Sequence, residues 1–254
     1  MGLLDEKTIL ITGAASGIGR ATAAEARAEG ARLLLADVND EQGEAVAAEL
    51  GEGASYVHCD VTDEASVQAV VAATVSELGR IDCAFNCAGI LGSLGNVGEL
   101  GLDGWKRIID VDLNGVFLCT KHELGAMVAQ GGGAILNMAS AAGLIGWPGA
   151  AGYVAAKHGV VGLTKSAALE YAPQNIRVNS ICPSYVLTPM VEKELFEEAL
   201  GNDEELIAAA RANHPIGRFA KVEEIAAAAT WLLSDKASFV TGTAMSVDGG
   251  YTAP

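Results

Sequence analysis

The sequence predicts an α/β fold in which a doubly wound parallel sheet of about seven strands carries helices on both faces. Short β-rich runs alternate along the chain with longer Ala-rich segments of helical pattern. Several of these runs, such as residues 8–12 (TILIT) and 32–37 (RLLLAD), read as continuous apolar strands. Strands of that kind are buried on both faces, which is typical of a parallel sheet covered by helices.

The expected strands are placed by their composition and by the turn residues that bound them. They are residues 8–12, 32–37, 55–58, 83–86, 134–138, 177–181 and 243–247. The chain has 254 residues, of which 50% are hydrophobic and 19% charged, enough for one large core. No internal repeat, low-complexity tract or linker interrupts it, so we expect residues 1–254 to form a single domain.

The charge balance and the first residues limit the classes of partner. The formal net charge is -16, which opposes binding to nucleic acid and to anionic membrane surfaces. The start, MGLLDEKTILIT, runs directly into a strand and lacks the basic and apolar regions of a signal peptide. No apolar run is long enough to span a bilayer. We therefore expect a cytoplasmic protein with no nucleic-acid or membrane partner.

The five cysteines are odd in number and lie mostly in apolar, strand-like segments. That placement predicts reduced core thiols rather than a disulfide framework. Cys83 and Cys87 do not have a CxxC spacing and lack a partner pair of His or Cys residues. No bound metal is therefore expected.

A glycine-rich turn, TGAASGIG at residues 12–19, follows the first strand, and a helix is expected from about Gly17 to Glu29. Glycines there let the backbone approach a pyrophosphate at the helix N-terminus, where amide donors and the helix dipole favour an anion. This is a Rossmann-like cradle for a dinucleotide, although its GxxxGxG spacing departs from GxGxxG. The expected cofactor contacts are Gly13, Ser16, Gly17, Ile18 and Gly19.

The second strand ends in Asp37, roughly twenty residues beyond the glycines, where a carboxylate accepts hydrogen bonds from the adenosine ribose. The same carboxylate would repel a 2′-phosphate. No arginine or lysine stands at the neighbouring positions that could attract one, which are Ala15, Ser16, Val38 and Asn39. The predicted cofactor is therefore NAD(H), with the alternative that Asp37 only caps the next helix.

The third and fourth strands end at the same edge of the sheet. After the third strand, Asp60 could accept the adenine amino hydrogens, or could share the capping of the next helix with Thr62 and Asp63. In the NCAG run at residues 86–89, the small Ala88 and Gly89 leave room for a cofactor against the backbone.

The segment after the sixth strand, CPSYVLTPM at residues 182–190, is a proline-bracketed turn that could position a nicotinamide. From about residue 190 to 219 the chain is acidic and helical, with several apolar residues, and it interrupts the alternation of strands. We interpret it as a lid over the substrate. The alternative is a simple surface pair of helices.

Residues 137–159, NMASAAGLIGWPGAAGYVAAKHG, place three polar side chains in a small, apolar setting. Tyr153 and Lys157 are four apart on a predicted helix and so share one face. A neighbouring ammonium lowers the pKa of a phenol from its ordinary value of about 10, which would make Tyr153 an acid/base. Ser140 follows a strand at the same sheet edge. Asn114 lies in the apolar stretch VDLNGVF, where an amide is either satisfied in the core or used.

Taken together, these residues resemble the classical type of the short-chain dehydrogenase/reductase family over essentially the whole chain. TGxxxGIG at residues 12–19, NCAG at 86–89, Asn114, Ser140 and YxxxK at 153–157 occur in the family's order and spacing. The resemblance implies Tyr153 as the acid/base and Lys157 as the residue that lowers its pKa and bonds the nicotinamide ribose. It implies Ser140 as the donor to the substrate oxygen, and Asn114 as the holder of a water in the proton relay.

The resemblance also implies a single dinucleotide-binding catalytic domain that assembles as a homotetramer. Further cofactor contacts are expected at Asp60, Val61, Asn86, Ala88, Gly89, Tyr153, Lys157, Pro183, Val186 and Thr188. Two positions depart from the family pattern. Cys87 stands where an asparagine is usual, and Ser184 stands where a glycine is usual; neither removes a catalytic group.

The substrate is expected to be an apolar secondary alcohol or ketone, because the loops near the site carry many apolar residues and few charges. The predicted substrate contacts are Ser140, Leu144, Trp147, Tyr153, Tyr185 and Met190. One alternative is a 3-oxoacyl carrier-protein reductase, which Asp37 and the acidic balance oppose. A second is a non-catalytic NAD-binding sensor or scaffold. A serine hydrolase is disfavoured because Ser140 lies in no GxSxG turn.

Overall fold

The computed structural model of the protein describes residues 2–253, and within them seven strands form one sheet in the order β3-β2-β1-β4-β5-β6-β7. Every neighbouring pair of strands is parallel. The strands are β1 Thr8–Thr12, β2 Arg32–Asp37, β3 Ala54–His58, β4 Cys83–Asn86, β5 Gly133–Met138, β6 Ile176–Pro183 and β7 Ala244–Val247. The predicted fold class is confirmed. β6 extends beyond its predicted end because Pro183 still pairs with Val247 of β7.

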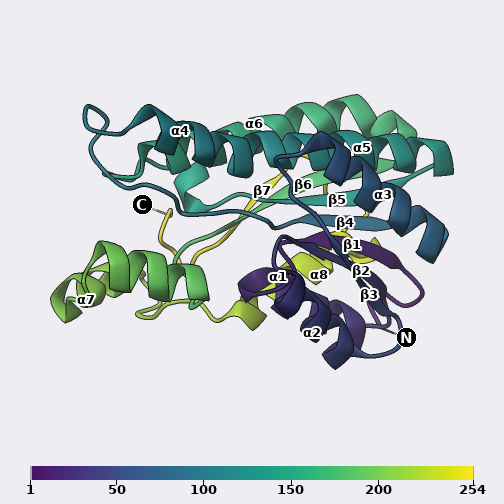
Figure 1. Ribbon diagram of the computed structural model, residues 1–254, viewed down its shortest axis with the longest axis horizontal. Helices are drawn as coiled ribbons and strands as arrows, with labels where there is room; N and C mark the ends of the chain where they lie inside the picture. Colours follow the sequence, from purple (N-terminus) through teal and green to yellow (C-terminus); the bar gives the residue numbers. More distant parts are fainter. Residues whose placement is uncertain (1, 254) are drawn as a thin grey trace.

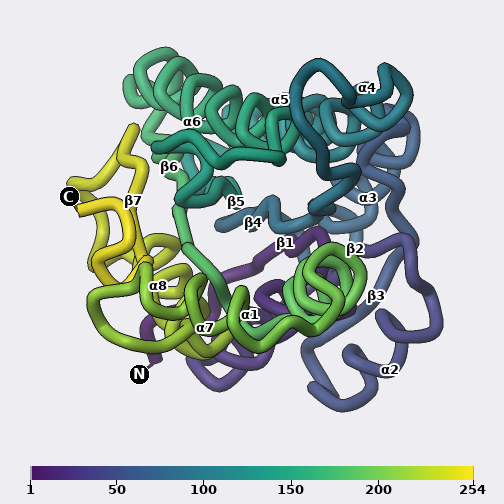
Figure 2. Tube along the Cα trace, turned by 90° about the vertical axis from the view of Figure 1, so that its left-hand side faces the viewer, coloured from purple at the N-terminus to yellow at the C-terminus, as the bar shows by residue number. Residues whose placement is uncertain are grey.

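The helices form one layer on each side of this sheet (Figures 1 and 2). α1, α2 and α8 lie on one side, and α3, α4, α5 and α6 lie on the other. Their bounds are α1 Gly17–Ala28, α2 Asp40–Leu50, α3 Glu64–Leu78, α4 Leu102–Ile109, α5 Val116–Gln130, α6 Ala151–Tyr171, α7 Glu204–Ala212 and α8 Val222–Leu233. None of the described helices is both long and apolar enough to cross a membrane.

The core has two halves, one on each face of the sheet. Along β2, Leu33 and Leu35 pack with the residues of α1 and α8, while Leu34 packs with those of α3 and α5. All three leucines are fully buried. Successive strand side chains point to opposite faces, so a strand that is apolar throughout fits a sheet that is covered on both sides.

The order of the strands reverses between β1 and β4. The chain moves outward from β1 to β2 and β3, and then returns to place β4 on the other side of β1. In open α/β sheets, ligands bind in the crevice that this reversal leaves at the carboxyl ends of the strands. The loops after β1 and β4 meet there so closely that a Cβ atom on Gly13 would lie 2.6 Å from the Ala88 nitrogen.

Two short helices lie between β6 and α8, where the sequence predicted an acidic helical segment. The first, Met190–Ala199, is π-helical, and the second is α7. Leu195 and Phe196 of the π-helix pack against Leu91, from the loop after β4, and against Phe219. This contact places the segment beside the crevice at the carboxyl ends of the strands.

Candidate active site

A large hollow of about 1070 Å³ lies at the carboxyl ends of the strands, at the point where the strand order reverses. The structure brings most of the predicted site residues to its wall. These are Gly13, Ser16, Gly17, Ile18, Gly19, Asp37, Asp60, Val61, Ala88, Gly89, Ser140, Tyr153, Lys157, Pro183, Val186, Thr188 and Met190. Five predicted residues do not line it: Trp147 and Tyr185, which line a neighbouring hollow, and Asn86, Asn114 and Leu144.

A small hollow of about 70 Å³ adjoins the large one and shares Ser140 and Tyr153 with it. Apart from Ser184, its other walls are apolar and aromatic, and no Asp, Glu, Lys or Arg side chain lines it. Trp147 meets Tyr153 and Tyr185 edge to face, with ring centroids 6.2 and 5.8 Å apart. Tyr251, near the end of the described chain, also lines this hollow. The sequence gives no local signal for that contact, because Tyr251 is distant along the chain from the other lining residues.

The glycine-rich turn after β1 leaves the N-terminus of α1 open to the large hollow. Gly13 and Gly17 have φ values of +67° and +51°, which favour glycine. A Cβ atom on Gly19 would lie 2.1 Å from the Gly13 carbonyl oxygen, so that position requires glycine as well. Ser16 precedes the helix without capping it, and the first turn carries no acidic residue. The free amides therefore form a site for an anion.

Asp37 is held beside this turn and does not cap the next helix. Its carboxylate accepts hydrogen bonds from the Ala15 and Asn39 amides, each at 3.0 Å. The cap of α2 is Asn39, whose side chain accepts a hydrogen bond from the Gln42 amide. The carboxylate thus lies on the wall of the large hollow, where the remaining lone pairs of its two oxygens can accept further hydrogen bonds.

Asp60 closes a short turn after β3 and also lines the large hollow. Its Oδ1 atom accepts hydrogen bonds from the backbone amide and the hydroxyl of Thr62, at 2.9 and 2.7 Å. Asp63, and not Asp60, caps α3, because it accepts a hydrogen bond from the Ala65 amide. Asp60 and Val61 are therefore placed where a ligand of the hollow would contact them.

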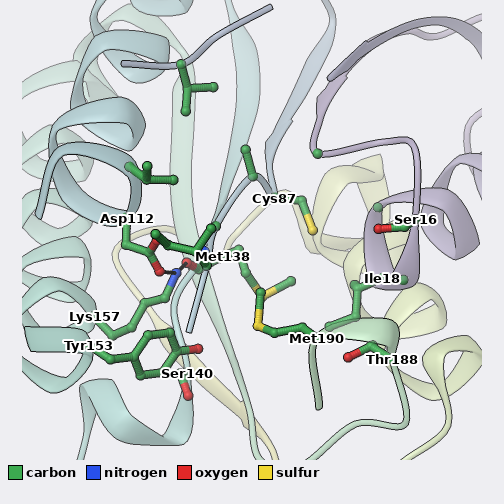
Figure 3. A pocket seen from close by; sticks show the side chains of 18 of the residues that line it. Ser16, Ile18, Cys87, Asp112, Met138, Ser140, Tyr153, Lys157, Thr188 and Met190 are labelled. Carbon is green, nitrogen blue, oxygen red and sulfur yellow. Dashed lines mark hydrogen bonds and ion pairs between the residues drawn. The ribbon is translucent and has the colours of Figure 1, made fainter. Parts of the chain in front are cut away.

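Tyr153, Lys157 and Ser140 lie together on one side of the large hollow, across from Ser16, Ile18 and Thr188 (Figure 3). α6 places Tyr153 and Lys157 one turn apart, and the Lys157 nitrogen lies 5.4 Å from the centre of the tyrosine ring. The Lys157 ammonium donates a hydrogen bond to the Met138 carbonyl at 3.1 Å. Ser140 follows β5, and its Oγ accepts a hydrogen bond from the Ala142 amide at 3.1 Å.

Comparisons with known proteins agree with this arrangement. A family model described as enoyl-(acyl carrier protein) reductase matches residues 13–252. The chain is 46% identical, over the full length of both proteins, to a 2,5-dichloro-2,5-cyclohexadiene-1,4-diol dehydrogenase of Sphingobium indicum. The chain belongs to the short-chain dehydrogenase/reductase family.

Two further proteins are similar to this short-chain dehydrogenase/reductase. A cyclohexanol dehydrogenase of Acinetobacter sp. strain SE19 is 46% identical over 98% of the chain and 96% of its own length. The crystal structure of a levodione reductase superposes with a TM-score of 0.95 and 40% identity, covering 98% of the chain and 99% of that structure. The relatives are thus named as oxidoreductases.

The pKa of Tyr153 in this family member is raised above its ordinary value of 10.0, opposite to the expected net direction. Burial of the phenol is the main cause, because it disfavours the charged form. Lys157 lowers the pKa, as predicted, but Asp112 raises it again. The pKa of Lys157 is itself raised, since the attraction of Asp112 and Tyr153 outweighs the effect of burial.

Asn114 does not line the large hollow, and the residue of this segment that meets Lys157 is Asp112. Asn114 is exposed, and its amide donates to the Asp110 carboxylate at 2.9 Å. Residues Asp110–Gly115 form a π-helical turn, which shifts the side chains away from the positions of an ordinary α-helix. Asp112 turns inward, is fully buried, and lies 3.1 Å from the Lys157 nitrogen. The sequence does carry a signal for Asp112. A carboxylate within the apolar run VDLNGVF indicates a buried charge, and a buried charge requires a partner.

The side chain of Asn86 also lies away from the large hollow, contrary to the prediction that it contacts a cofactor. It donates hydrogen bonds to Glu123 and Asn137, at 2.9 and 3.0 Å, inside the layer between the sheet and α5. The cause is strand geometry, because side chains at the end of β4 still alternate between the faces of the sheet. Burial raises the pKa of Glu123 to about 7.

Leu144 was predicted to contact the substrate, and the structure corrects this as well. It packs against a buried cluster that includes Val116 and Val160. Its neighbour Ile145 lines the small hollow instead. Leu144 directly follows the one-turn helix Ala141–Gly143, and this turn directs its side chain into the core.

Ser184, which departs from the family's usual glycine, takes part in a hydrogen-bond chain next to both hollows. Its Oγ lies 2.9 Å from the His214 ring and 3.2 Å from the Asp248 carbonyl oxygen. His214 is buried at the end of α7 and contacts Tyr185 and Phe219. The serine therefore connects the turn after β6 with the helices of residues 190–212 and with the C-terminal segment.

Proposed function

We propose that this protein is an NAD(H)-dependent dehydrogenase that interconverts a monocyclic secondary alcohol and the corresponding ketone. The main support is that Ser140 and Tyr153 line both hollows, so that one pair of hydroxyls faces a dinucleotide-sized space and an apolar one. The absence of charged residues around the small hollow, within the described chain, suits an uncharged ring. Relatives named for cyclohexadiene-diol and cyclohexanol oxidation support the same class.

The residues around the large hollow fit a nicotinamide dinucleotide. The open N-terminus of α1 suits its pyrophosphate, with Gly13, Ser16, Gly17, Ile18 and Gly19 around it. Asp37 would accept hydrogen bonds from the adenosine ribose and repel a 2′-phosphate, which favours NAD(H). The remaining proposed contacts are Asp60, Val61, Ala88, Gly89, Pro183, Val186 and Thr188. When bound, the cofactor supplies the acceptor or donor of a hydride.

The chain's own residues would move and hold the proton. Tyr153 takes the proton of the substrate hydroxyl during oxidation and returns it during reduction. Ser140 donates a hydrogen bond to the substrate oxygen, which stabilises the charge that develops there. Lys157 lies next to the ring of Tyr153 and would donate a hydrogen bond to the cofactor ribose. Trp147, Tyr185 and Met190 enclose the ring of the substrate.

The segment of residues 190–219 is proposed to be a lid over the small hollow. Met190, Val191 and Leu195 of the π-helix line that hollow. The Glu194 carboxylate accepts a hydrogen bond from the Leu91 amide at 3.3 Å, which connects the segment to the loop after β4. The homotetramer stays a prediction, supported by exposed apolar residues such as Leu169 and Phe239. The cytoplasmic location and the single-domain organisation also stay predictions.

A coupled screen of substrates and cofactors tests the proposed reaction. NADH formation would be measured with cyclohexanol, cyclohexane-1,4-diol, a linear secondary alcohol and a 3-hydroxysteroid, each with NAD⁺ and with NADP⁺. We expect the highest kcat/KM for a monocyclic alcohol with NAD⁺, because the small hollow of about 70 Å³ is tight and apolar. Bound NADH without turnover on any alcohol or ketone would favour a sensor or scaffold instead.

A carrier-protein reductase is the second candidate, because the matching family is described by an acyl-carrier-protein substrate. The net charge of -16 opposes it, since an acidic carrier would be repelled. Including a 3-oxoacyl thioester with NADH in the same screen separates the two. A kcat/KM for the thioester above that for every cyclic ketone would replace the proposed function.

The cofactor preference should depend on Asp37. Asp37→Ser removes the charged acceptor for the ribose and the repulsion of a 2′-phosphate, so kcat/KM with NAD⁺ should fall about 10- to 100-fold. Activity with NADP⁺ should rise at the same time. Steady-state kinetics with both cofactors measures the ratio, and Asp40→Ser, an exposed carboxylate outside the hollow, is the control. An unchanged ratio in Asp37→Ser would remove the argument for NAD(H).

A further inference from the structure

Asp112 is the only carboxylate within ion-pair distance of Lys157 in residues 2–253, and both side chains are buried. One carboxylate oxygen, Oδ1, accepts a hydrogen bond from the Ile90 amide at 2.9 Å. The other, Oδ2, lies 3.1 Å from the Lys157 nitrogen but accepts no well-aligned hydrogen bond from the described residues. The link between Asp112 and Lys157 is therefore mainly charge attraction, in a place where solvent does not screen it.

The surroundings fix this carboxylate in position. A Cβ atom on Gly89 would lie 3.2 Å from Asp112 Oδ2 and 3.4 Å from the Lys157 nitrogen, so the loop after β4 packs closely against both groups. The Met138 carbonyl holds the ammonium from the other side. Figure 3 shows Asp112 and Lys157 joined at the same side of the large hollow as Tyr153.

From this geometry we infer that Asp112 is a positioning residue, whose carboxylate holds the Lys157 ammonium beneath Tyr153 and offsets its charge, thereby setting the pH at which alcohol oxidation begins. The inference rests on the proposed function of Tyr153 as the acid/base. An ammonium alone would favour the phenolate, whereas an ammonium paired with a buried carboxylate favours it less. The enzyme would then oxidise alcohols best in alkaline solution and reduce ketones at neutral pH.

The charged and titratable groups around the phenol are few. From the turn of residues 110–115 comes Asp112, from α6 comes Lys157, and from the loop after β4 comes Cys87. Burial raises the pKa of Cys87 to about 12, so its thiol is uncharged at working pH. The end of β5 contributes only the neutral Met138 carbonyl. The charge near Tyr153 is therefore governed by Asp112 and Lys157.

The sign of the effect follows from these charges. Asp112→Asn keeps the acceptor for the Ile90 amide but removes the negative charge, so the Lys157 ammonium acts on Tyr153 without compensation. The phenolate then forms at lower pH. The pH at which kcat/KM for alcohol oxidation rises should therefore be lower than in the wild type by about one pH unit. Below that rise, the variant should oxidise the alcohol up to about tenfold faster than the wild type. The pH above which kcat/KM for ketone reduction falls should decrease by the same amount.

The test compares pH profiles of kcat/KM for oxidation of a ring alcohol by the wild type and by Asp112→Asn. Glu123→Gln is the matched control, because it removes another buried carboxyl group that does not face Lys157. A purely structural role would lower activity without moving the profile, and a profile that stays in place, or moves upward, would overturn the inference. If the wild type turns over no alcohol, the proposed function fails instead.

A second measurement follows the ionisation of Tyr153 directly and does not require turnover. In proteins labelled with ¹³C at the tyrosine ζ-carbons, the Tyr153 resonance is assigned by its loss in Tyr153→Phe. We expect it to titrate at higher pH in the wild type than in Asp112→Asn or Asp112→Ser, because the buried carboxylate offsets the Lys157 charge. A titration midpoint in the wild type equal to or below that of both variants would overturn the inference.

Discussion

Tyr153→Phe is expected to reduce kcat for alcohol oxidation by about 10³-fold or more, while NADH binding stays within a few-fold of wild type. The substitution removes only the hydroxyl that would move the proton. The ring remains to pack edge to face with Trp147 and to cover Lys157. Steady-state kinetics with a monocyclic alcohol and a fluorescence titration with NADH measure the two quantities separately.

Tyr171→Phe is the control for this substitution, because Tyr171 lies at the end of the same helix and outside both hollows. We expect its turnover and NADH binding to match the wild type. If Tyr153→Phe retained more than about a tenth of the turnover, proton transfer by this residue would contribute less than general acid/base catalysis normally does. If it lost NADH binding instead, its role would be structural.

Gly19→Ala is expected to weaken NADH binding by about 10- to 100-fold and to lower thermal stability. Its Cβ atom would lie 2.1 Å from the Gly13 carbonyl oxygen, so the turn between β1 and α1 has to move. Overpacking of this kind costs about 1–3 kcal/mol, and the displaced amides no longer converge on an anion. NADH titration and thermal unfolding test both effects.

The matched control is Gly125→Ala in α5, where an added Cβ atom meets no atom within 4 Å. Alanine is favoured over glycine inside a helix, so this variant should unfold at the same or a higher temperature and bind NADH normally. Wild-type NADH affinity in Gly19→Ala would show that the glycine-rich turn does not hold the cofactor.

The fold was predictable because the decisive signals are local. The apolar strands and their glycine turns occur in the sequence itself. Gly13, Asp37 and Ser140 lie at strand ends that meet at one edge of the sheet, and the helix α6 brings Tyr153 to the same place. The π-helical turn at residues 110–115 was not predictable from helical periodicity. The sequence therefore did not indicate that Asp112, rather than Asn114, points toward the site. The direction of the Tyr153 pKa shift depends on burial and on Asp112, which only the tertiary structure brings together.

The central claim is direct hydride transfer from a ring alcohol to NAD⁺ with Tyr153 as the proton acceptor. The most direct measurement incubates the enzyme with NAD⁺ and cyclohexanol that carries deuterium at the carbinol carbon, followed by mass spectrometry of the reduced cofactor. We predict that one deuterium per turnover appears in NADH with the wild type, and that almost none appears with Tyr153→Phe. Reduced cofactor without deuterium, or an equal amount of labelled product from Tyr153→Phe, would contradict the account.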